Sequence, residues 1–345
     1  MQIVNNLRLR KLLGFLLLVF AANLTIADEP QVTQTEFAEK AKAAAKMATD
    51  EGTVSFEGID GWRFFRRELE HLASGGFRTK AGGVDPIEII TDYGTELKAL
   101  GVQMIVVPIP AKARVYPEKF TAGADGKSLT PLSEFLKNLD DAGFATIDLE
   151  NEFASRKAKA PDRLLFPKQD IHVSPYGCEV IAEIIAAKLA EEGLLKIGEE
   201  KDSFKISDEA MVANYQYLLE KEEQETLEME KLPAREVLRD KSIVETDPDS
   251  PVLVMGGADL IIYHLDTLTD FEGGGIIDHL QARLGLAVDS EFSLGDGVSV
   301  PRIEIARRAF GDRTMWKKKK VLVWCFAEHQ FGRDRWKAGI PADPK

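Results

Sequence analysis

Asp170 and His172 are the residues whose types and spacing best suit acid–base chemistry, and they lie in a loop just before a periodic helical stretch. An aspartate two positions away can hold an imidazole in one tautomer and stabilise its protonated form. The other ring nitrogen is then free to take a proton from a nucleophile. The same pattern occurs in metal sites and by chance, so an ordinary histidine in a surface loop is the alternative. No second cluster of His and Cys has metal-ligand spacing, and we expect neither a metal nor a cofactor.

A glycine turn after an apolar run is the second place where chemistry is expected. Residues 252–255 are typical of a strand that is covered on both faces, and Gly256 and Gly257 follow before a helix begins. Esterases and acyltransferases place a nucleophilic serine on such a turn, whose backbone N–H groups can also hold an oxyanion. Here the corresponding residue is Ala258. The turn therefore predicts an oxyanion site but no nucleophile. The oxyanion candidates are Gly256 and Gly257 of this turn, together with Gly295.

The polar residues near these motifs are poor substitutes for the missing serine. Asp259 is expected to point elsewhere and to favour the start of a helix electrostatically. Ser174 is expected to cap the next turn, and Ser250 to lie at the opposite end of the sheet. His264 and His279 are interpreted as ordinary surface or core histidines.

A cationic and aromatic set, Lys112, Arg114 and Tyr116, follows the apolar run at 102–108. Ligands gather in the loops after parallel strands, and these side chains suit a sugar carboxylate or hydroxyl. We therefore treat them as substrate-binding candidates. The alternative is that the tyrosine packs the loop while the two cations are solvated.

Apolar runs and periodic segments alternate along most of the chain. Strands are expected at 102–108, 145–149, 252–255 and 320–326, and helices at 35–47, 66–73, 87–100, 132–142, 177–192 and 276–284. Such alternation predicts a mainly parallel sheet with helices on both faces. Residues 28–55 are interpreted as a helical lead-in, and 56–345 as the main domain.

The charge of the chain limits its partners. It holds 44 Lys and Arg against 57 Asp and Glu, a net charge of −13, which argues against nucleic acid and gives no reason to expect an anionic membrane. An anionic polysaccharide stays compatible, because the local charge of a site can oppose the global charge. The most charged stretch, 208–241, is expected to be helical, as a solvated face or an insertion arm. A structural protein that binds a partner through this acidic arm is a further interpretation.

Residues 1–27 have the pattern of an export signal, with a cationic start, an apolar run at 12–22 and a small residue, Ala27, at the expected cleavage point. The run is shorter than the roughly 20 residues of a membrane span, and an uncleaved signal anchor is the alternative. We therefore expect a periplasmic or secreted protein. In such a compartment Cys178 and Cys325 could form a disulfide, although two buried free thiols are the favoured interpretation.

Taken together, these segments resemble the SGNH hydrolase-like domain of the AlgX/AlgJ alginate O-acetyltransferase family. The resemblance covers roughly residues 56 to 336, with the segments in the family's order. The matching segments are 58–65, 106–118, 170–177 and 252–256, with weaker matches at 295–297 and 323–328. The resemblance implies a three-layer α/β/α sandwich. We place the charged helical insertion expected from the charge pattern at about 200–248. It also implies transfer of acetyl groups onto or off an exported polysaccharide.

The resemblance also assigns roles to residues. It makes His172 the general base, Asp170 its orienting partner and Ala258 the position of the family's serine. A methyl group cannot form an acyl intermediate, so the covalent route is closed. Cys325 and His329 replace a family acid and arginine, and His329 becomes a further substrate-binding candidate. We expect a degenerate site that binds glycan or an acetylation partner. An active O-acetyltransferase or acetylesterase, using water activated by His172 or another nucleophile, is the alternative.

Overall fold

The apolar runs of the sequence become the strands of one parallel sheet. Its order is β11-β10-β12-β3-β4, and every neighbouring pair is parallel. The central strands are β10 (Val252–Gly256), β12 (Val321–Ala327) and β3 (Gln103–Ile109), and they are buried at nearly every position. The edge strands are β11 (Asp289–Phe292) and β4 (Ala145–Thr146). Two-sided burial explains why the central strands read as continuous apolar runs.

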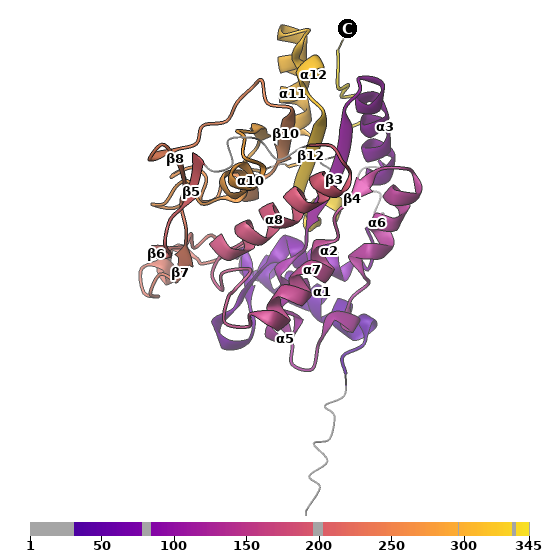
Figure 1. The fold of residues 1–345 in the computed structure, drawn as a ribbon. Helices are drawn as coiled ribbons and strands as arrows, with labels where there is room; N and C mark the ends of the chain where they lie inside the picture. The colour runs from indigo at the N-terminus through magenta and orange to yellow at the C-terminus, as the bar shows by residue number, and fades with distance from the viewer. Residues whose placement is uncertain (1–30, 78–83, 196–202, 296, 333–335, 345) are drawn as a thin grey trace, which may run out of the picture. The chain divides into compact units, whose positions relative to one another are not determined.

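The computed structural model describes residues 31–77, 84–195, 203–295, 297–332 and 336–344 (Figure 1). The export signal predicted at 1–27 lies outside these residues. Within the described part of the chain, no helix combines the length and the apolar character needed to cross a membrane.

Helices cover both faces of the sheet, because alternate strand residues enter two separate cores. Ile105, Val254 and Val323 belong to one core, and Val106, Met255 and Trp324 to the other. The first core is completed by α1 (Gln34–Glu51), α7 (Leu149–Lys159), α8 (Pro175–Glu191) and α10 (Ile276–Leu284). The second is completed by α3 (Pro86–Ala99), α6 (Leu132–Asp141), α11 (Val300–Gly311) and α12 (Met315–Lys318). The predicted three-layer α/β/α sandwich is confirmed.

Local capping fixes where α8 begins, directly after the loop that holds His172. The Ser174 hydroxyl accepts a hydrogen bond from the N–H of Gly177 at 3.0 Å, and Pro175 occupies the first helical position. Ser174 thus acts as the cap that the sequence predicts. A second cap, Asp148, starts α7 and leaves β4 shorter than the predicted 145–149.

A hairpin and three short helices complete the part of the domain nearest the site. The hairpin pairs β1 (Ser55–Glu57) with β2 (Arg63–Phe65) and leads directly into α2 (Arg66–Ala73), which matches its predicted bounds. After β3 the chain forms α4 (Lys112–Val115) and α5 (Pro117–Phe120). Both cysteines, Cys178 and Cys325, are buried free thiols, in agreement with the favoured interpretation.

The prediction of a charged helical insertion is wrong in its secondary structure. Residues 203–244, hereafter the charged segment, form short strands and a single helical turn (Figure 1). These elements are β5 (Phe204–Ile206), β6 (Ala210–Ala213), α9 (Lys221–Gln224), β7 (Lys231–Ala234), β8 (Val237–Arg239) and β9 (Ser242–Ile243). The stretch has no apolar stripe with which a long helix could pack, and a helix without such packing is marginal in water.

Tertiary contacts instead decide the conformation of the charged segment. Val237 and Val244 are buried with Phe204 against Ala282 of α10, in a small core of their own. The Glu230 carboxylate accepts the N–H of Lys168 at 2.7 Å, so part of the negative charge serves to attach the segment to the domain. The segment is therefore packed on the sandwich and is not a free acidic arm.

Gly256 is required by the close approach of β10 and β12. A Cβ added at this position would lie 1.8 Å from the carbonyl oxygen of Cys325 and 2.9 Å from its carbon. Since those atoms are backbone, they cannot move aside without distorting the strand pair. The glycine at this position is therefore explained by packing, as well as by the oxyanion site expected from the sequence.

We expect Gly256→Ala to lower the free energy of unfolding by about 3 kcal/mol, because the added methyl group overpacks the centre of the sheet. Urea titration followed by circular dichroism measures the loss. The matched control is Gly311→Ala at the end of α11, where an added Cβ meets no atom within 4 Å. That change should leave stability within about 1 kcal/mol of the wild type. Equal small effects at both positions would contradict the packing argument.

Candidate active site

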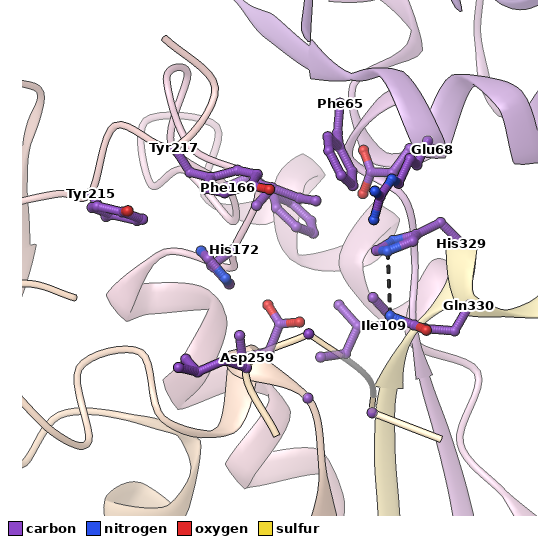
Figure 2. A pocket seen from close by; sticks show the side chains of 18 of the residues that line it. Phe65, Glu68, Ile109, Phe166, His172, Tyr215, Tyr217, Asp259, His329 and Gln330 are labelled. Carbon is purple, nitrogen blue, oxygen red and sulfur yellow. Dashed lines mark hydrogen bonds between the residues drawn. The ribbon is translucent and has the colours of Figure 1, made fainter. Parts of the chain in front are cut away.

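A cavity of about 270 Å³ opens at the carboxyl ends of the central strands (Figure 2). Ile109 at the end of β3, Gly257 after β10 and Ala327 at the end of β12 all line it. This is where ligands bind in open parallel sheets. Side chains from the His172 loop, from the start of α2 and from the charged segment complete the wall; they include Arg67, Glu68, Ile171, His172, Tyr215 and Tyr217.

Asp170 and His172 are brought together at this cavity. The Nδ1 atom of His172 lies 2.7 Å from Asp170 Oδ1, and the backbone N–H of His172 donates to the same oxygen at 2.7 Å. The second oxygen of Asp170 accepts the N–H of Tyr217 at 3.1 Å. Only 1% of Asp170 is exposed, so these bonds replace water around a buried carboxylate. The ring is held in one orientation, with Nε2 left for a ligand.

The charges around His172 decide its protonation. Burial alone works against the imidazolium, but the charge and hydrogen bond of Asp170 outweigh it, and Asp259 and Glu68 add to the effect. Together these effects raise the pKa of His172 to about 9. At neutral pH the ring is therefore protonated and donates hydrogen bonds. It can act as a base only when the pH approaches that raised value.

Ala258 lies in the cavity wall and contributes only a methyl group. It begins η5 (Ala258–Leu260), a single turn that directly follows β10 and Gly257. Among the described residues of the lining, none is a serine, threonine or cysteine. The two loops that carry His172 and Ala258 meet here, as the sequence predicts, since both residues line the same cavity.

Asp259 is placed differently from the expectation that it points elsewhere. It lines the cavity, and its Oδ1 accepts the N–H of Val173 at 3.2 Å, which ties η5 to the loop of His172. Figure 2 shows its carboxylate on the side of the cavity that His172 faces. The error arose because a short turn, not a long helix, follows β10. Burial raises the pKa of the Asp259 carboxyl, although the positive charge of His172 partly opposes this rise.

Two of the three oxyanion candidates line the cavity. Gly257 and Gly295 do so, whereas Gly256 stays within β10 and is absent from the wall. Gly297, which the sequence analysis did not single out, also lines it; a Cβ there would lie 2.9 Å from the nitrogen of Gly257. The two glycines therefore lie too close together for a side chain at Gly297 without a backbone shift.

The prediction that Lys112 faces the substrate is wrong. Its side chain is fully buried, and Nζ donates to the carbonyl oxygens of Pro167 at 2.8 Å, Lys168 at 3.0 Å and Asp170 at 2.7 Å. Burial lowers the pKa of Lys112 to about 8, although the nearby charge of Glu68 partly opposes this effect. Lys112 therefore positions the loop that presents Asp170 and His172.

Arg114 and Tyr116 are also absent from the cavity wall. Arg114 donates to the Glu328 carboxylate from Nη2 at 2.7 Å and from Nε at 2.9 Å, and its Nη1 donates to Glu150 at 3.1 Å. The Tyr116 hydroxyl accepts the N–H of Leu165 at 2.9 Å. The chain forms the helical turns α4 and α5 here, where a loop was expected from the sequence. These turns direct both side chains back into the core.

Glu328 is the counterion that this buried arginine requires. Burial works to raise its pKa, but the charge of Arg114 and the hydrogen bond of His71, whose Nε2 lies 3.1 Å away, hold that pKa well below its usual range. Its other oxygen accepts the N–H of Ala111 at 2.9 Å. These bonds join the end of β12 to the segment after β3 and so brace the rim of the cavity.

His329 does line the cavity and packs edge-on against Phe65, with ring centroids 5.4 Å apart. Three further residues of the wall, Glu68, Tyr215 and Tyr217, were not predicted from the sequence. The two tyrosines alternate with Asn214 and Gln216, a pattern that could have indicated an extended segment with one aromatic face. The other residues weighed above, Ser250, His264 and His279, are buried away from the cavity wall.

The chain is similar to proteins whose family is known. The family model described as "SGNH hydrolase-like domain, acetyltransferase AlgX" matches residues 56–256, more than half of the chain. The chain belongs to this family. The matched range ends two positions before Ala258, so the pairing of Ala258 with the family's serine rests on the resemblance in the strand and turn.

Curated relatives support membership of the AlgX family. "Probable alginate O-acetylase AlgJ" of Pseudomonas aeruginosa is 30% identical over 140 residues, which cover 41% of this chain and 34% of the relative. The protein of the same description from Azotobacter vinelandii is 28% identical over 139 residues, covering 40% and 34%. The aligned stretch thus spans about a third of each relative.

Solved structures agree with the AlgX-family fold. The O-acetyltransferase domain of Pseudomonas putida AlgJ has a TM-score of 0.62 and 21% identity, covering 82% of this chain and 93% of that one. Pseudomonas aeruginosa AlgX has a TM-score of 0.58 and 18% identity, covering 81% and 64%. At these identities the likeness concerns the fold.

The raised pKa of His172 predicts a pH-dependent part of stability. The folded pKa of about 9 exceeds the unfolded value of about 6.5, so the stabilisation is complete below about pH 6.5 and is lost as the pH rises through 9. We expect His172 to account for about 3 kcal/mol of the fall in the free energy of unfolding over this range. Urea titrations between pH 6 and 9.5 measure the change.

The control for this titration is His172→Gln, which keeps a hydrogen-bonding side chain but has no proton to lose. Its stability should be lower at pH 6, and its loss of stability between pH 6 and 9.5 should be about 3 kcal/mol smaller than that of the wild type, because only the contribution of His172 is removed. If the variant and the wild type show the same pH dependence, the charge assigned to the imidazole is wrong.

Proposed function

We propose that this AlgX-family protein binds an exported polysaccharide in the cavity beside His172 and does not carry out covalent acetyl transfer. The observation that carries the proposal is the combination of a hydrogen-bonded Asp170–His172 pair with a methyl group at Ala258. Asp170 can hold the imidazole of His172 in one orientation and stabilise its protonated form, so that the ring can bind a ligand. Without a hydroxyl or thiol beside it, no acyl-enzyme can form at this turn.

The protonation of His172 supports the same conclusion. A serine route needs a neutral imidazole to accept the hydroxyl proton, whereas the pKa of this ring is raised to about 9. An imidazolium in a partly enclosed cavity is instead a strong hydrogen-bond donor to an anionic or polar group. The names of the relatives, which describe alginate O-acetylases, support a polysaccharide as the ligand. The export signal predicted at 1–27 supports placement outside the cytoplasm.

A serine-independent acetylesterase is the second candidate, and one observation favours it. The carboxyl group of Asp259 lies in the cavity beside the imidazole, so the site holds two groups that could activate water. This candidate requires that the wild-type protein hydrolyse esters in a manner that depends on His172. The binding proposal requires that it does not.

Ala258→Ser tests whether the cavity lacks only a nucleophile. We expect the variant to hydrolyse p-nitrophenyl acetate at least about tenfold faster than the wild type, because the new hydroxyl would stand beside an oriented imidazole. The rate should rise with pH up to about 9, since only the deprotonated ring accepts the hydroxyl proton. Initial rates between pH 6 and 10 measure both effects.

Two controls accompany this measurement. Ala258→Gly changes the same position without adding a hydroxyl and should stay at the wild-type rate. The double variant with Ala258→Ser and His172→Gln should lose the gained activity. Wild-type hydrolysis that disappears in His172→Gln would contradict the binding proposal and favour the acetylesterase.

Direct binding is the second test. Isothermal titration calorimetry with unacetylated mannuronate hexasaccharide should show saturable binding by the wild type. Binding should weaken above about pH 9, because His172 loses its positive charge there. If the hexasaccharide and its O-acetylated form both fail to bind at pH 7, the proposed function is wrong.

A further inference from the structure

Tyr215 and Tyr217 leave their rings exposed at the cavity. Their exposed fractions are 36% and 39%, and both line the cavity wall. Neighbouring exposed aromatic side chains at a groove indicate a binding site, and their flat faces suit ligands with an apolar side. A pyranose ring has such a side, formed by its C–H groups, while its hydroxyl groups point outward from the edge.

The two rings continue a wall that starts at His172. Their centroids are 6.2 Å apart with an interplanar angle of 37°, and they lie 6.5 and 6.3 Å from the imidazole. Phe65 extends the wall, with its centroid 5.9 Å from that of Tyr217. Figure 2 shows Tyr215 and Tyr217 on the same side of the cavity as His172. A sugar stacked on them would place its neighbour in the chain close to the imidazole.

Alternation along the backbone aims both rings at the cavity. Asn214, Gln216 and Leu218 are buried, whereas the two tyrosines between them are exposed. The buried positions are anchored: the Gln216 amide donates to Gln169 Oε1 at 2.8 Å, and the N–H of Leu218 donates to the Gln169 carbonyl at 3.1 Å. The wall is therefore preorganised, which reduces the entropy cost of stacking a ligand.

A cation stands beside this wall. Arg67 lines the cavity, and its guanidinium lies 5.8 Å from the centroid of Phe65. Among the described residues no ion pair involves Arg67, whereas its neighbour Arg66 pairs with Glu70 at 3.7 Å and Arg63 with Glu57 at 3.1 Å. Burial raises the pKa of Glu68 to about 8, which weakens the negative charge beside this cation near neutral pH. A ligand carboxylate could therefore pair with Arg67 without displacing an ion-pair partner.

From these contacts we infer that Tyr215 and Tyr217 form a stacking subsite for a pyranose ring and that Arg67 binds the carboxylate of a uronate unit. The inference rests on the proposed function, because it places the sugar in the same cavity. It adds the residues that hold the chain and the charge that they select.

Binding measurements on four variants test the subsite. Tyr215→Ala and Tyr217→Ala should each weaken binding of unacetylated mannuronate hexasaccharide by about tenfold. Tyr217→Phe should bind like the wild type, because stacking needs the ring and the hydrogen bond to Asp170 comes from the backbone. Arg67→Gln should weaken the uronate by about tenfold or more and remove most of its salt dependence. The neutral cellohexaose should bind more weakly than the uronate and should not respond to Arg67→Gln.

Phe310→Ala is the matched control, since Phe310 is an exposed aromatic residue on α11, 61% exposed and outside the cavity wall. It should leave binding unchanged. Wild-type binding with undiminished affinity in both tyrosine variants would overturn the subsite but leave the proposed function intact. Absence of binding by the wild type would instead overturn the proposed function. Equal affinity for the uronate and the neutral sugar, unaffected by Arg67→Gln, would overturn the role of Arg67.

Discussion

The buried carboxylate of Asp170 is the constraint on which the site depends. A charge with so little exposure must have its oxygens satisfied by donors, and here three backbone and ring N–H groups serve. They come from its own loop, from the imidazole of His172 and from Tyr217 in the charged segment. The ammonium group of Lys112 binds the carbonyl of the same aspartate from the core side. One residue thus connects the loop, the ring and the segment into a single arrangement.

Much of the sandwich could be predicted because its strands carry the signature of burial in their own residues. The runs that become β3, β10 and β12 are apolar on both sides, so no knowledge of their neighbours was needed. The helices α2, α3 and α6 likewise show their apolar periodicity locally. The conformation of the charged segment could not be predicted from such local patterns. Its residues favour helix individually, yet its conformation depends on Val237 and Val244 finding a core on α10.

The same distinction separates the site residues that were foreseen from those that were not. Asp170 and His172 are close in sequence, and a short loop is enough to bring them together. The turn at Ala258 follows directly from the strand before it. By contrast, Lys112 and Arg114 turn inward because partners from distant segments, the 167–170 loop and Glu328, need their charge. No local pattern contains that information, and the resemblance to a family assigned no role to either cation.

The hydrogen bond from the Tyr217 backbone to Asp170 has a consequence for how this protein can diverge. The charged segment is not an appendage that can be shortened or exchanged while the loop beneath it stays the same. Without the segment, one carboxylate oxygen of Asp170 would be exposed to solvent, and the imidazole of His172 would be held less firmly. A change in the charged segment that alters ligand recognition is therefore expected to alter the protonation of His172 as well.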